Sequence, residues 1–164
     1  MATLKIKNID RLTRKLNDLV DMDLNKSMND AVKIVHANAK SLAPTNKRGG
    51  GGTLAESIHM DVDKKPNQII GRVYTNLEYA MYVEFGTGIK GNGTYPYDIE
   101  GVSLTYRDSG WCYWDEKEEK WIYTTGQKAQ PYMYPALKNN EKAIKKLFNN
   151  GVIKEVTGIC KGGQ

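Results

Sequence analysis

Apolar residues recur every three or four positions along two stretches at the start of the chain. The first stretch carries Ile9, Leu12, Leu16 and Leu19 between charged residues. The second, longer stretch carries Leu24, Met28, Ala31, Val35, Ala39 and Leu42. This spacing predicts two amphipathic helices. Pro44 ends the second helix, because the residue before a proline is pushed out of helical geometry.

The pattern changes after Pro44. Residues 45–53 read TNKRGGGGT, and four consecutive glycines lose too much backbone entropy on ordering to form a regular element, so we expect a mobile basic loop. Beyond it, Ile58, Met60 and Val62 alternate with polar residues, and the β-rich run IIGRVYT follows at 69–75. A period of two and an intervening Pro-Asn turn predict an antiparallel hairpin over 57–75.

The rest of the chain mixes short elements. Residues 79–88, YAMYVEFGTG, are compatible with a short helix stopped by Gly86, although a strand also stays open. Turn residues and aromatic β-runs fill 89–129, and we expect a hairpin that pairs 111–114 with 121–124. Pro135 is suited to open a last helix, and Gly151 is placed to end it.

Helices and strands are segregated along the chain, which is typical of an α+β protein. We expect a small antiparallel sheet packed by a long helix of the N-terminal half and by a C-terminal helix, with an inserted aromatic β-hairpin. The 164 residues fit a single domain. We place that domain at 1–151, with 89–129 as a hairpin-rich insertion and 152–164 as a flexible tail.

Composition narrows the class of protein. With 40% hydrophobic and 26% charged residues, the chain has ordinary globular usage. Cys112 and Cys160 lie far apart without a CxxC pair, which predicts neither a zinc ribbon nor a disulfide framework. The N-terminus, MATLKIKNIDRL, mixes charged and apolar residues every two or three positions, and no run of 18 apolar residues occurs, so we expect no signal peptide, no membrane span and a place in the cytoplasm.

Three motifs resemble reactive sites but lack the context that the chemistry needs. Residues 86–91 spell GxGxxG, yet the turns that follow cannot open the helix that would hold a pyrophosphate. His59, Asp61 and Asp63 share a strand face, but positions i and i+4 on a strand lie about 13 Å apart. Neither cysteine has a supporting neighbour for nucleophilic chemistry. We therefore expect no catalytic residue, metal or cofactor, and no enzyme.

Aromatic residues are concentrated in the predicted 111–124 hairpin. They are Trp111, Tyr113, Trp114, Trp121 and Tyr123. These rings present more surface than one small hairpin can cover by itself. Two interpretations stay open: the rings pack on their own domain, or they form a protein interface, where Trp and Tyr are enriched as anchors.

Three segments, in order, resemble a known family. Leu42-Ala43-Pro44 is followed by TLAESI at 53–58, then by YAMYVEFGTG at 79–88, and then by QPYMYPAL at 130–137. Over residues 9–148 they are similar to the minor structural proteins of tailed bacteriophages that join heads to tails or complete tails. The resemblance implies a homo-oligomeric ring at the neck or tail top of the virion. Its partners would be connector and tail proteins, with DNA passing through the ring and no membrane contact.

The resemblance also implies architectural roles for particular residues. Glu84 would hold backbone donors, Phe85-Gly86-Thr87 would form a sharp turn, and the segment at 131–135 would fix the approach to the last helix through Pro131, Met133 and Pro135. Two segments depart from the family pattern: KRGGGG, and the long aromatic stretch after Ile89. We therefore expect partner contacts at Lys47 and Arg48 and at the five hairpin rings.

Two alternatives to the joining role remain. The near one is a tail-terminator or other tail-tube subunit. The one from a different class is a basic DNA-binding module, motivated by a net charge of +5 and a sequence pI near 9.1. It would use the loop at 45–53 and four lysines near the last helix: Lys138, Lys142, Lys145 and Lys146.

Overall fold

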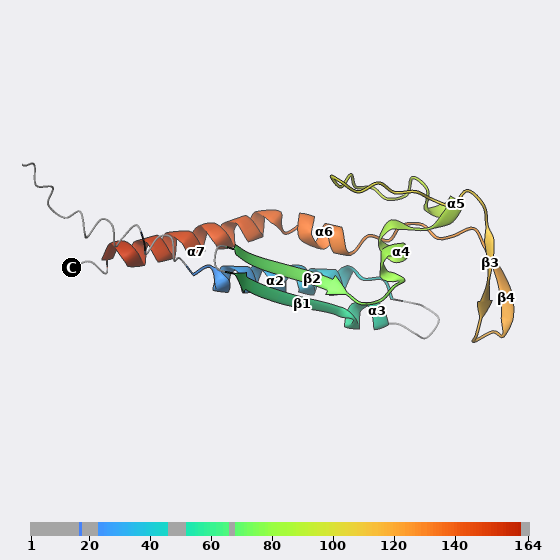
Figure 1. The fold of residues 1–164 in the computed structure, drawn as a ribbon, viewed down its shortest axis with the longest axis horizontal. Helices are drawn as coiled ribbons and strands as arrows, with labels where there is room; N and C mark the ends of the chain where they lie inside the picture. Colours follow the sequence, from blue (N-terminus) through green and yellow to red (C-terminus); the bar gives the residue numbers. More distant parts are fainter. Residues whose placement is uncertain (1–16, 18–22, 46–51, 66–67, 162–164) are drawn as a thin grey trace, which may run out of the picture. The chain divides into compact units, whose positions relative to one another are not determined.

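A computed structural model describes residues 17, 23–45, 52–65 and 68–161 (Figure 1). The chain is α+β, as its sequence predicts, with two two-stranded sheets and helices in the N-terminal half and at the C-terminal end. Its described residues divide into two compact units: residues 17, 23–33, 61–65, 68–72 and 141–161 belong to the first, and residues 34–45, 52–60 and 73–140 belong to the second. The helix predicted over 9–19 lies outside the described residues except for Asn17.

The predicted long helix is α2, Asn25–Leu42. Its apolar stripe is buried: Ala31 and Val32 belong to the first unit, and Val35 and Ala39 belong to the second. The Asp23 carboxylate accepts the Asn25 N–H at 3.0 Å, which satisfies one of the donors left open at the start of a helix. The helix ends two residues before Pro44, as expected from the restriction that proline imposes.

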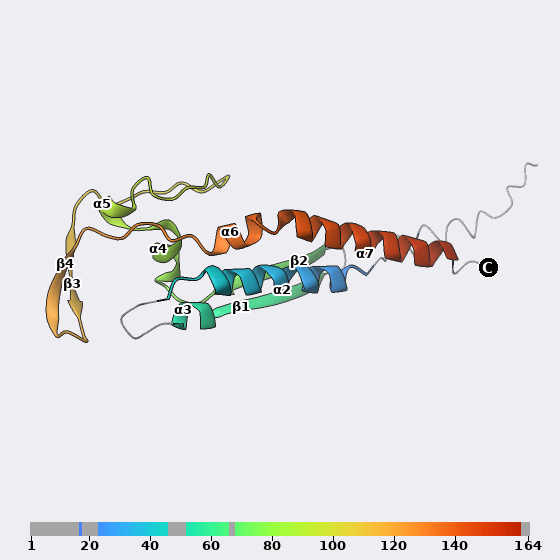
Figure 2. The ribbon, with the colours of Figure 1, turned by 180° about the vertical axis from the view of Figure 1, so that it is seen from behind.

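The predicted hairpin over 57–75 is confirmed as β1, Ile58–Lys65, and β2, Gln68–Thr75. Figure 2 shows α2 in front of this hairpin. A Cβ on Gly71 of β2 would collide with Met28 and Val32 of α2, so the helix packs directly against the strand backbone there. In the second unit, the His36 ring donates from Nε2 to the Ile58 carbonyl oxygen at 2.9 Å and ties α2 to the start of β1.

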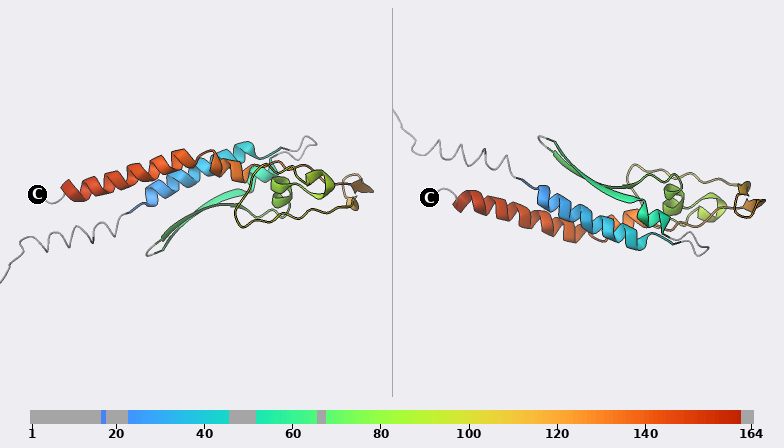
Figure 3. Two further views of the ribbon diagram at one scale, coloured as in Figure 1. Left: turned by 90° about the horizontal axis from the view of Figure 1, so that it is seen from above. Right: turned by 90° about the horizontal axis from the view of Figure 1, so that it is seen from below.

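The C-terminal segment differs from the prediction. The single helix expected from Pro135 is two helices, α6 over Met133–Lys138 and α7 over Glu141–Lys161. Gly151 does not end α7, because it lies at the contact with α2: a Cβ there would collide with the Ser27 hydroxyl. The start of α2 and helix α7 lie side by side in Figure 3. Residues 152–161 of the predicted flexible tail therefore extend α7.

Short helices dominate the second unit. They are α3, Thr53–Glu56, α4, Ala80–Phe85, and α5, Gly88–Gly91. The open choice at 79–88 is thus resolved as helix, and α4 ends where Gly86 takes a φ of 79°, a region that favours glycine. The buried apolar side chains of this unit are Val35, Ala39, Ala43, Leu54, Ile58, Ala80, Tyr132 and Ala136.

The aromatic hairpin forms as predicted. Strand β3, Trp111–Asp115, pairs antiparallel with β4, Lys120–Thr124. In this register Trp114 lies opposite Trp121 and Cys112 lies opposite Tyr123, so these four side chains share one face. Residues 92–110, which connect α5 to β3, contain turns but no further helix or strand.

Candidate functional site

Glu84 of α4 is a buried charged side chain of the second unit, with only 5% of its surface exposed. Its carboxylate accepts three backbone N–H groups from the chain that enters α6. Oε2 accepts from Tyr132 at 2.7 Å and from Met133 at 2.8 Å, and Oε1 accepts from Tyr134 at 3.1 Å. One side chain thereby holds α4 to a segment that lies 48 to 50 positions further along the chain.

This arrangement satisfies the start of α6 completely. A helix leaves its first N–H groups without partners inside the helix, and a buried one needs each of them paired. The N-cap residue is Tyr132, and the Glu84 carboxylate takes the N–H of that residue and of the next two. The following residue is Pro135, which has no N–H to satisfy. One carboxylate and one proline therefore account for all four positions.

A row of aromatic rings reaches the carboxylate through Tyr95. Phe85, Tyr95, Tyr97 and Tyr134 follow one another with ring centroids 4.9, 5.6 and 5.0 Å apart. The Tyr95 hydroxyl donates to Glu84 Oε1 at 3.5 Å. Burial and the nearby Glu84 charge raise the pKa of the Tyr95 phenol well above its usual range. Burial likewise raises the pKa of Tyr132 to about 12, with the Glu84 charge as the next cause.

The turn after α4 closes the base of the long insertion. Thr87 donates its N–H to the Gln127 carbonyl at 2.9 Å, and Gln127 returns a bond to the Thr87 carbonyl at 3.1 Å. Three residues further on, the Gln130 N–H reaches the Val83 carbonyl at 2.8 Å. The two ends of the insertion therefore meet at the same place, and residues 89–126 form an excursion with a fixed base inside the second unit.

The hairpin rings divide into a packed one and exposed ones. Trp111 contacts Gly88 and lies 5.7 Å from the Arg107 guanidinium, so this ring packs on its own unit. Trp114, Trp121 and Tyr123 are 49%, 68% and 66% exposed. Trp114 and Trp121 pack edge to face at 5.9 Å. Tyr113 is also exposed. Packing on the protein's own unit thus holds for Trp111, whereas a protein interface at the four exposed rings stays a prediction.

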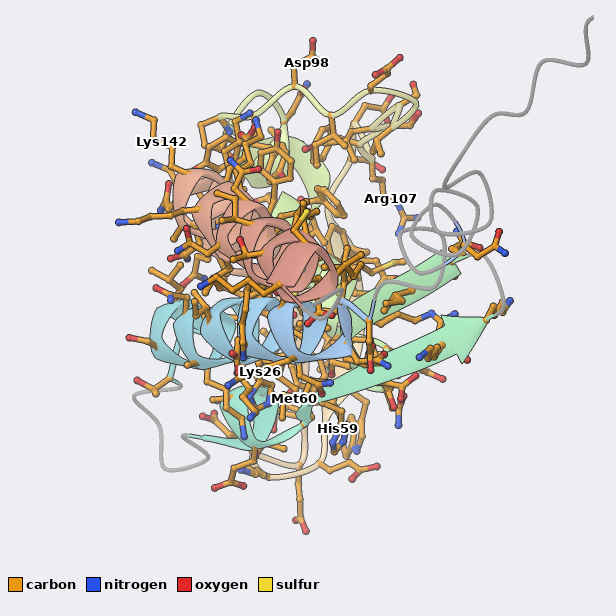
Figure 4. The ribbon with its side chains drawn as sticks, turned by 90° about the vertical axis from the view of Figure 1, so that its left-hand side faces the viewer. Lys26, His59, Met60, Asp98, Arg107 and Lys142 are labelled. Atoms are coloured by element: carbon orange, nitrogen blue, oxygen red, sulfur yellow. The ribbon has the colours of Figure 1, made fainter. Side chains whose placement is uncertain are left out.

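The remaining candidate residues are placed as follows. Lys47 and Arg48 lie outside the described residues. Asp61 and Asp63 both pair with the guanidinium of Arg72 of β2, at 3.2 and 3.7 Å. His59, labelled in Figure 4, has the Tyr74 ring as its neighbour at 5.9 Å. Within the described ranges, no group of three His, Cys, Asp or Glu side chains could hold a metal ion.

Sequence reasoning missed several residues of this site. Tyr95, Tyr97 and Gln127 lie in the turn-rich insertion, and no local pattern marks them as neighbours of α4. Arg107 was equally unmarked. One indirect signal could have pointed to such partners. A lone acidic residue in the apolar run YVEF needs a buried hydrogen-bond partner if that run packs inward.

Residues 6–86 match the model of a family described as "Bacteriophage HK97-gp10, putative tail-component". This match, just under half of the chain, confirms the resemblance to phage tail components, which are structural proteins of the virion. Comparison with curated proteins and with solved structures gave no match. None of the helices in the described part of the chain is both long and apolar enough to cross a membrane.

Proposed function

We propose that this protein is a non-enzymatic, ring-forming subunit at the neck or tail top of a tailed phage, where it joins the capsid connector to the tail. The observation that carries the proposal is the family match together with the contacts of Glu84. The match ends at Gly86 and includes Glu84, whose three backbone partners lie in the 130–137 segment. The contacts of Glu84 thus connect the matched region directly to the third segment of the resemblance, which lies beyond the match.

The three segments of the resemblance also supply most of the core of the second unit. Ala43 comes from the first, as do Leu54 and Ile58 in its continuation. Ala80 comes from the second, and Tyr132 with Ala136 from the third. Because these buried positions determine how the segments pack, their order along the chain supports a shared fold.

A joining subunit leaves a distinct defect when it is absent. Phage particles that lack the protein should accumulate as filled heads and separate tails, visible by negative-stain imaging. Joined particles would contradict the proposal. Binding assays against purified connector and purified tail-tube protein separate the near alternative, since a tail terminator should bind the tube and not the connector. DNA passage through the ring belongs to the same proposal.

A further inference from the structure

One face of α7 carries lysines and an exposed apolar residue. Lys142, Lys146, Asn149 and Ile153 follow at spacings of four, three and four residues, which places them in one row on the helix. All four are exposed, and Ile153 is 62% exposed. Figure 4 shows Lys142 extending outward from α7. We call this row the α7 stripe.

The α7 stripe points away from the helix that α7 packs against. The Ser27 hydroxyl of α2 donates to the Leu147 carbonyl at 3.4 Å, and Gly151 lies against Ser27 and Leu24. Positions 147 and 151 lie on the opposite side of the helix from the stripe, given 3.6 residues per turn. The contact with α2 therefore leaves the stripe open.

The tip of the β3–β4 hairpin has the complementary character. Residues 115–120 read DEKEEK, four carboxylates against two lysines, in a chain whose net charge is +5. The Asp115 carboxylate accepts the N–H groups of Lys117 and Glu118 at 3.0 and 3.1 Å and so fixes the turn. Glu116 and Glu119 are exposed. The exposed Trp114–Trp121 pair lies directly beside this acidic tip.

The exposed hairpin rings supply part of the area that one side of a protein contact needs. With about 150–250 Å² per ring and the exposed fractions of Trp114, Trp121 and Tyr123, they offer roughly 300–400 Å² of apolar surface. A standard interface buries about 800 Å² on each partner. The rings alone fall short of that size, so a contact of standard size would have to include the charged tip as well.

We propose that the hairpin of one copy docks on the α7 stripe of the next copy, with the acidic tip over Lys142 and Lys146 and the Trp114–Trp121 pair near Ile153. Such a contact joins different surfaces of identical chains, and it closes into a ring when the rotation between copies permits. The inference rests on the proposed ring function and names the contact that builds the ring. It also gives the acidic tip a partner in an otherwise basic chain.

Charge reversal of the full chain tests the contact. The tip variant is Glu116→Lys with Glu119→Lys, and the stripe variant is Lys142→Glu with Lys146→Glu. Each alone should weaken self-assembly, measured by sedimentation velocity, by at least about tenfold. An equimolar mixture should restore it, because every tip then meets a stripe of opposite charge. Matched controls are Asp98→Lys with Glu100→Lys, and Lys154→Glu with Lys161→Glu, which change exposed charges elsewhere.

Cross-linking of assembled particles covers the case in which the ring forms only beside its neighbours. A carbodiimide that links carboxylates to lysines should connect Glu116 or Glu119 to Lys142 or Lys146 between isotopically distinct copies. Links within one copy only, links to a different protein only, or no such links would overturn the inference. So would tip and stripe variants that assemble like the wild type. In each case the proposed function is judged separately: it stands as long as heads and tails still fail to join when the protein is absent.

Discussion

Replacing Glu84 with glutamine tests the central contact of the second unit. The amide keeps the shape of the side chain but has one carbonyl oxygen in place of two carboxylate oxygens. If that oxygen takes the Oε2 position, it retains the N–H groups of Tyr132 and Met133, and the amide NH₂ then faces the Tyr134 N–H at about the present 3.1 Å. Two donors would point at each other inside the protein.

The cost follows from these bonds. Loss of the charge weakens two short hydrogen bonds, and the Tyr134 N–H loses its acceptor at a site where Glu84 is only 5% exposed. An unsatisfied buried donor costs about 1–3 kcal/mol, and a charge-assisted bond is worth about twice a neutral one. We expect Glu84→Gln to lower the free energy of unfolding by about 2–4 kcal/mol. For a chain of this length the midpoint of thermal unfolding should fall by roughly 10 °C.

Urea and thermal denaturation followed by circular dichroism measure this loss. The matched control is Glu78→Gln, because Glu78 is exposed two residues before α4 and its substitution should change stability by less than about 0.5 kcal/mol. If both variants unfold alike, the carboxylate does not hold the start of α6 in the way described. Limited proteolysis should also show faster cleavage near residues 130–134 in the Glu84 variant alone.

Four further outcomes are expected. Stability should fall as pH rises from about 10 towards 12, because Tyr132 has a pKa of about 12 in the folded chain and about 10 when unfolded, so the unfolded state loses its proton first. Ultraviolet titration of the wild type and of Tyr132→Phe checks this, and identical titration profiles of the two proteins would refute it. Gly151→Ala should destabilise by about 1–3 kcal/mol because its Cβ would meet Ser27, whereas Gly158→Ala, where nothing lies within 4 Å, should be neutral or stabilising in the same denaturation assay. Since α2, β1 and β2 each supply residues to both units, the two should unfold in one calorimetric transition, as a single domain over 1–151 requires; two separate transitions would count against it. The purified protein should bind duplex DNA weakly, and tight binding that falls steeply with salt would instead favour the DNA-binding alternative.

Local patterns account for the elements that the sequence predicted well. The apolar stripe of α2, the alternation in β1 and the pairing of β3 with β4 each depend on residues close together in the chain. The short helix α4 was only partly determined, because a run of ten residues with apolar positions suits a helix or a strand until Gly86 takes its positive φ.

The continuation of α7 through Gly151 and the residues missed around Glu84 both concern contacts between distant residues. Glycine after an apolar stripe commonly ends a helix, yet at Gly151 the missing side chain serves a close approach to Ser27, 124 positions earlier in the chain. The row of rings beside Glu84 depends on an insertion whose turns have no periodicity to read. Such contacts are decided by which surfaces remain to be buried once the local elements exist.

The sequence by itself determined the class of fold, the aromatic hairpin and a resemblance to phage tail components. It also singled out Glu84, in the segment YAMYVEFGTG, as a residue that holds backbone donors. Only the tertiary structure decided that this carboxylate satisfies the entry to α6 and that α7 continues through Gly151 with a lysine row facing outward. The physical reason is that periodicity records which side of an element is buried, whereas the partner that buries it is fixed by packing and by the need to pair every buried backbone donor.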